Sequence, residues 1–206
     1  MIASSKFMVN SDADRMAAAS YATENFAWQV KLDKHETLRL SLLVEETLGM
    51  AKTVLDDFYG QIWFTADGKA CEIHFEATAD MYEERKEELL SVSSTGMNAA
   101  KRGFMAKLGE MISGALHSAG KTMDTYGQTM NYGIIYNPNV MSGNTDMMTV
   151  WTLQTYRNDL DLARGDSDNA EEAWDELEKS IVAKLADDIV VGVKGDRIDL
   201  VIKKEF

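Results

Sequence analysis

Residues 38–51 read LRLSLLVEETLGMA, and their apolar side chains recur at steps of three and four. The recurring positions, continued to residue 55, are Leu40, Leu43, Val44, Thr47, Leu48, Ala51, Val54 and Leu55. This period places them on one face of an α-helix. We therefore predict an amphipathic helix that starts at Asp33 or Lys34, ends near Leu55 and packs on a core through that face.

Elements on either side of this helix can be predicted in the same way. A helix is expected over 12–30, capped by Ser11 or Asp12. Its apolar stripe would be Met16, Ala19, Tyr21, Phe26 and Val30. On the other side, residues 61–65 and 70–77 alternate as strands do, and Asp67-Gly68 between them is a strong hairpin signal. A helix pair followed by a β-hairpin is therefore expected.

The second half of the chain is predicted from the same periodicities. The expected helices are 82–90, 101–116 and 168–186, and the expected strands are 133–136, 148–156, 189–193 and 197–203. Asp168 and Glu171 would form a capping box, and the inward positions of that helix would be Trp174, Leu177, Ile181, Val182 and Leu185. Most of 118–146 is interpreted as loop. Tight turns between strands favour antiparallel pairing, and hence an α+β layer fold.

Composition limits the class of protein. The chain has 206 residues, of which 45% are hydrophobic, enough for a buried core. Its net charge of −13 disfavours binding to a nucleic-acid backbone. Cys71 is the single cysteine, so an intrachain disulfide is excluded. With no signal-peptide pattern and no apolar run of bilayer length, we expect a cytoplasmic protein without membrane contact.

Several known functional motifs match this sequence only in part. Residues 115–122, ALHSAGKT, match a loose phosphate-loop pattern, yet a helix rather than a strand is expected before them. Residues 165–169, GDSDN, lack the last glycine of a nucleophile elbow. Four aspartates, Asp159, Asp161, Asp166 and Asp168, are interpreted as a solvated acidic loop. The three histidines lack metal-ligand spacing, so we expect no metal site of His and Cys.

One family resemblance emerges from residues 38–51. They look like the signature helix of the GHKL ATP-binding fold, which includes histidine-kinase catalytic domains and anti-sigma-factor serine kinases. In that family a glutamate on this helix acts as a base, and an asparagine four residues later holds magnesium. Here Glu46 falls on the glutamate position and Met50 on the asparagine position.

The resemblance also implies a fold and a set of nucleotide-binding positions. It implies one domain over 1–206, a two-layer sandwich with helices on one face of a mixed, mainly antiparallel sheet, enlarged at about 117–186. Asp80 would stand where the family's adenine-binding aspartate follows a strand, without the usual glycines. The family's later glycine-rich box is matched only weakly, by Gly96, Lys101, Arg102 and Gly103. In that box a helix N-terminus and two cations would face phosphates.

Three functions follow as alternatives. The first is a GHKL-like, anti-sigma-like regulatory domain that acts through a protein partner, with ATP binding weak or lost. Methionine offers a thioether where magnesium takes oxygen ligands, so Met50 argues against efficient ATPase or kinase chemistry. The second is an active ATP-dependent serine/threonine kinase of the same fold, with Glu46 catalytic. The third is a small-molecule binding module that uses the same cleft. A homodimer is implied only by analogy with the anti-sigma kinases.

Overall fold

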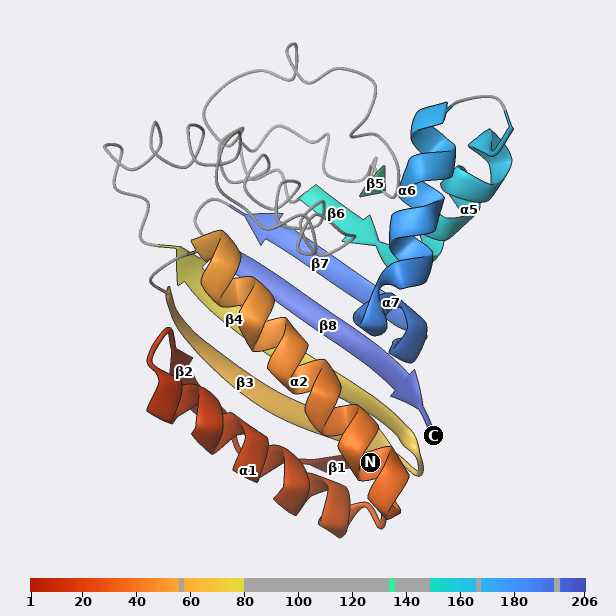
Figure 1. Cartoon of the computed structure of the whole chain (residues 1–206). Helices are drawn as coiled ribbons and strands as arrows, with labels where there is room; N and C mark the ends of the chain where they lie inside the picture. Colours follow the sequence, from red (N-terminus) through yellow and green to blue (C-terminus); the bar gives the residue numbers. More distant parts are fainter. Residues whose placement is uncertain (56–57, 80–133, 136–148, 166–167, 195–196) are drawn as a thin grey trace, which may run out of the picture.

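One antiparallel sheet with helices packed against it organises the chain (Figure 1). The computed structural model describes residues 1–55, 58–79, 134–135, 149–165, 168–194 and 197–206. The described helices are α1 (Ala13–Gln29), α2 (Lys34–Leu55), α5 (Leu153–Ala163), α6 (Asp168–Lys179) and α7 (Ile181–Leu185). The strands are β1 (Ile2–Ala3), β2 (Phe7–Asn10), β3 (Phe58–Asp67), β4 (Ala70–Ala79), β5 (Ile134–Ile135), β6 (Thr149–Thr152), β7 (Asp188–Lys194) and β8 (Arg197–Glu205).

The strand order is β1-β3-β4-β8-β7-β6-β5, and β2 also pairs with β3, beside β1. Every pairing between described strands is antiparallel. The longest ladders are the β3–β4 hairpin and the β4–β8 pair, which brings the C-terminal strand to the middle of the sheet. In Figure 1, α2 lies over the β3–β4 hairpin and α1 lies beside α2, near β1 and β2, whereas α5, α6 and α7 lie beside β6 and β7. The expected α+β fold with a mainly antiparallel sheet is confirmed.

The core lies between this helix layer and one face of the sheet. Alternate residues of the central strands are buried because successive side chains of a strand point to opposite faces. Phe26 of α1 packs on Phe64 of β3 with ring centroids 5.3 Å apart, and Phe58 meets Phe75 edge-on at 5.6 Å. The predicted apolar face of α2 is buried from Leu40 to Ala51. Periodicity therefore located the core correctly here.

Several elements match the sequence expectations closely. Both N-terminal helices, the hairpin around Asp67-Gly68 and the terminal strand pair are confirmed. Gly68 has a φ of 62°, as a tight hairpin turn requires. β5 lies inside the strand expected over 133–136. The helices predicted over 82–90 and 101–116 lie outside the described residues.

The strand predicted over 148–156 is wrong in its second half. β6 ends at Thr152, whose hydroxyl accepts a hydrogen bond from the backbone N–H of Thr155 at 3.1 Å and caps α5. Asp159 and Asp161, interpreted as part of an acidic loop, therefore lie on a helix. The alternation of apolar residues was misleading, because Trp151 is buried on strand β6 whereas Leu153 and Tyr156 are buried on helix α5.

The helix predicted over 168–186 is broken in two. Ser180 has extended backbone angles, and its hydroxyl accepts from the N–H of Ala183, so it caps α7 after α6 has ended. The break turns Ile181 outward to 50% exposure, against the prediction that it faces the core. Tyr21, placed in the apolar stripe of α1, is 69% exposed and is a second error.

The two edge strands β1 and β2 were not predicted from the sequence, because their two and four residues are too short to show alternation. Within the described ranges, no helix combines the length and hydropathy that crossing a bilayer needs.

Candidate functional site

Glu46 and Met50 are the two predicted site residues that the structure describes. Both lie on α2 four residues apart, so they are neighbours on one helix face. Glu46 is partly exposed, whereas Met50 is only 8% exposed. The carboxylate can therefore reach solvent or a ligand, while the thioether beside it belongs to the buried core.

The start of α2 is fixed by a capping box. Asp33 Oδ1 accepts hydrogen bonds from the N–H groups of His35 and Glu36 at 2.8 and 2.9 Å. In return, Glu36 Oε2 accepts from the N–H of Asp33 at 2.8 Å. Lys69, in the turn between β3 and β4, donates to the other carboxylate oxygen of Glu36. The helix that carries Glu46 and Met50 is thus tied to the hairpin beneath it.

These contacts shift the pKa values of three side chains. The pKa of Glu36 is lowered by its hydrogen bond from Lys69 and by that from the backbone of Asp33. The pKa of Asp33 is lowered mainly by its hydrogen bond from the backbone of Glu36. The pKa of Lys69 is raised, chiefly by its hydrogen bond to Glu36. All three groups therefore hold their charges over a wider pH range in the folded protein.

The remaining predicted nucleotide-binding residues lie outside the described residues. They are Asp80, Gly96, Lys101, Arg102 and Gly103. β4 ends at Ala79, next to the position of Asp80 in the sequence. Glu46 and Met50 are thus the part of the predicted site whose placement can be compared with the expectation.

The donor set on α2 does not fit magnesium. Mg²⁺ takes oxygen ligands in near-octahedral geometry, and a thioether is a soft ligand. Glu46 alone supplies oxygen at the two family positions. Over the described ranges, no group of three or more His, Cys, Asp or Glu side chains is arranged to hold a metal ion. No catalytic step can therefore be derived through a metal at Glu46 and Met50.

The element that precedes residues 165–169 also argues against a nucleophile elbow there. Gly165, with a φ of 92°, follows α5 and Arg164 rather than a strand. A nucleophile elbow needs a strand to deliver its serine at the top of a sheet. Gly165 instead serves the turn between α5 and α6.

A polar cluster on the opposite face of the sheet was missed in the sequence. Trp63 of β3 and His74 of β4 are cross-strand partners whose rings stack at 5.0 Å with an interplanar angle of 4°. Lys6 Nζ lies 4.0 Å from the Trp63 ring centroid. His74 Nε2 lies 3.0 Å from Thr65 Oγ1 and 3.2 Å from Glu72 Oε2. A turn centred on Asp67-Gly68 would have paired Trp63 with Glu72. The two turn residues are instead Gly68 and Lys69, and this register pairs Trp63 with His74.

This cluster does not have the geometry of a catalytic triad. A histidine that activates a hydroxyl uses one ring nitrogen for the nucleophile and the other for the orienting carboxylate. Here Thr65 and Glu72 both meet Nε2. Burial lowers the pKa of His74, against the opposing effect of Glu72. The arrangement stabilises a stacked aromatic pair on the sheet rather than a nucleophile.

The geometry defines an α+β protein with a mainly antiparallel sheet and a helix layer. Comparisons with protein-family models, with curated proteins and with solved structures found no match. We therefore infer a function from the residues of this chain.

Proposed function

We propose that this chain is a GHKL-like regulatory domain that acts by binding a protein partner, and that its nucleotide binding is weak or lost. The observation that carries the proposal is the pair on α2: a solvent-accessible Glu46 followed one turn later by a buried Met50. The helix keeps the residue expected of a base but replaces the residue expected to hold magnesium.

The order and layering of the elements support this proposal. The resemblance implies an N-terminal helix, a signature helix, a hairpin and a closing strand pair, all in one layered domain. α1, α2, the β3–β4 hairpin and the β7–β8 pair follow in that order. The sheet joins them, because β8 pairs with β4.

The chemistry of phosphoryl transfer explains why the substitution at position 50 matters. The metal bridges phosphate oxygens and neutralises the charge that develops during transfer. In this chain Glu46 could accept a proton from an attacking group, but Met50 supplies no oxygen to a cation. We therefore assign the protein a binding role rather than an efficient kinase or ATPase role.

Calorimetric titration with ATP and with ADP, each with and without magnesium, tests the nucleotide part of the proposal. The expected result is no magnesium-dependent binding tighter than a Kd of about 1 mM. Tight, magnesium-dependent binding by the wild-type chain, together with ATP turnover that Glu46→Ala abolishes, would establish the active kinase instead.

A further inference from the structure

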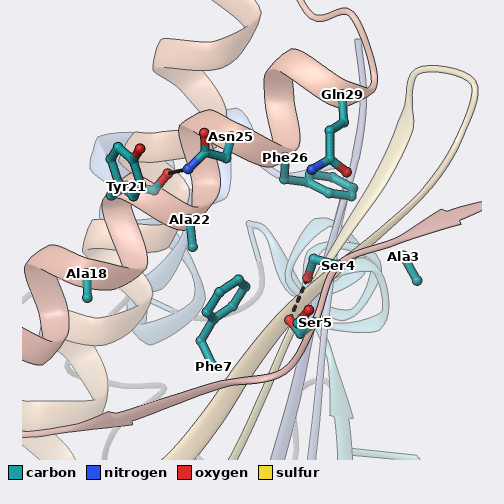
Figure 2. A pocket seen from close by; sticks show the side chains of 10 residues that line it. All are labelled: Ala3, Ser4, Ser5, Phe7, Ala18, Tyr21, Ala22, Asn25, Phe26 and Gln29. Atoms are coloured by element: carbon teal, nitrogen blue, oxygen red, sulfur yellow. Dashed lines mark hydrogen bonds between the residues drawn. The ribbon is translucent and has the colours of Figure 1, made fainter.

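A groove runs between α1 and the N-terminal segment at the edge of the sheet (Figure 2). Its volume is about 430 Å³. One wall is formed by the segment from Ala3 to Phe7, and the other by α1. The lining side chains from α1 are Ala18, Tyr21, Ala22, Asn25, Phe26 and Gln29. The groove shares no residue with the Glu46–Met50 pair.

The lining of this groove carries no charged side chain, although 27% of the chain is charged. Its floor and walls are mainly apolar, through Phe7, Ala22 and Phe26. Two amide side chains, Asn25 and Gln29, stand at one rim. A charged ligand group would lose its hydration here without gaining an ionic partner. The groove therefore suits an uncharged, largely apolar group.

The segment beside the groove is a sheet edge. β1 and β2 pair with β3 along opposite halves of its length, and in the described part of the chain neither has a strand on its other side. Ser4 anchors the stretch between them, because its N–H donates to Phe64 O and its hydroxyl accepts from Phe64 N–H, both at 2.9 Å. The outer edge thus offers backbone donors and acceptors at the two-residue period of a strand.

Exposed apolar side chains gather around the same edge. Ile2 is 43% exposed, Met8 57%, and Tyr21, on the groove wall, 69%. Of these, Tyr21 lines the groove, whereas Ile2 and Met8 belong to the edge strands, and Met8 points to the opposite face of the sheet from the groove-lining Phe7. Large apolar side chains left in water along one edge are a mark of interaction surfaces.

We propose that this edge and groove bind an extended peptide segment of the protein partner by strand addition. The peptide backbone pairs with the β1–β2 edge, and an uncharged apolar side chain of the peptide enters the groove against α1. The inference rests on the proposed function in requiring a protein partner. The edge fixes the conformation of the occupant, since an open strand edge pairs with another strand. The uncharged lining fixes its chemistry.

Selection from a phage-displayed library of random linear peptides tests this proposal. Peptides enriched on the full-length wild-type protein are synthesised, and their affinities are measured by fluorescence polarisation. Ala18→Arg places a long charged side chain in the groove wall. Ala17→Arg is the matched control, because Ala17 is equally an exposed alanine of α1 but does not line the groove. Amide hydrogen exchange with and without peptide reports on the backbone of β1 and β2.

The proposal predicts enriched peptides with uncharged apolar residues, a loss of affinity of about tenfold or more in Ala18→Arg, and little change in Ala17→Arg. Bound peptide should also slow amide exchange in β1 and β2. Failure to enrich any peptide, or equal affinity for both variants, overturns it. Such a failure leaves the nucleotide titration untouched, because that titration reports on α2.

Discussion

Lys69, in the turn of the β3–β4 hairpin, forms an ion pair with Glu36 in the first turn of α2. Glu36 also closes the capping box with Asp33, so one carboxylate connects the helix start to the sheet. Both contacts depend on an ionised Glu36, which makes them dependent on pH.

Stability conferred by Asp33 and Glu36 should be lost in acid. Their folded-state pKa values lie below the ordinary values of 3.8 and 4.5, so the folded state binds these protons less readily than the unfolded state. The contribution is present above those ordinary values and is lost as pH falls through the lower folded values. Urea unfolding of wild type and Glu36→Gln should give a clear difference at pH 7 that shrinks below a pH of about 4. A difference that is constant with pH would contradict the assignment.

Lys31→Gly should stabilise the protein. Lys31 has a φ of 59°, and its N–H and that of Leu32 donate to Trp28 O and Ala27 O, which is the Schellman pattern at the end of α1. Glycine adopts this conformation without the penalty of about 1 kcal/mol that other residues incur. The melting temperature of the protein should therefore rise. Lys52→Gly, inside α2, is the control and should lower stability by about 1 kcal/mol. A lower melting temperature for Lys31→Gly would refute this account of the turn.

Gly60→Ala should be destabilising. A Cβ at Gly60 would lie 2.6 Å from Glu76 O on β4, so the two strands would have to move apart. Overpacking of this kind costs about 1–3 kcal/mol, measurable by denaturant unfolding. Gly49→Ala is the comparison, because a Cβ there meets no described atom within 4 Å and alanine favours a helix. Equal stability of the two variants would show that β3 and β4 are not so closely packed.

Cys71 should be unreactive in the folded protein. Its side chain is 2% exposed, and burial raises the pKa of its thiol to about 11. The thiolate, which is the reactive form, is therefore scarce at pH 8. Ellman's reagent should react very slowly with native protein and fully in denaturant. Rapid native reaction would mean that Cys71 does not face the core.

The elements that the sequence predicted correctly share a strong local signal. α2 has an apolar period that runs from Leu40 to Leu55, and the β3–β4 hairpin has Asp67-Gly68 between alternating strands. Where the signal was wrong, a local helix cap decided the outcome. Thr152 ends a strand and caps a helix within a run of buried residues, and Ser180 breaks a period that seemed continuous.

The candidate sites also differ in how far local sequence spacing could predict them. The placement of Glu46 and Met50 on one face of α2 was predictable because it depends on spacing within one helix, whereas their role in a site stays a prediction. The Trp63–His74 stack could not be predicted from the Asp67-Gly68 signal, because the turn lies one residue later, at Gly68 and Lys69, and this moves the partner of Trp63 from Glu72 to His74. The groove beside α1 could not be predicted, since β1 and β2 are too short to be recognised before their pairing with β3 is known.

We propose that methionine at position 50 prevents this helix from holding a magnesium nucleotide. Calorimetric titration of Met50→Asn with ATP and magnesium, against Met50→Leu as the apolar control, tests it most directly, with circular dichroism to verify folding. We expect Met50→Asn to bind ATP at least about tenfold more tightly than wild type, only with magnesium, and Met50→Leu to match wild type. Identical, negligible binding by a folded Met50→Asn, or tight magnesium-dependent binding by wild type, would contradict the claim.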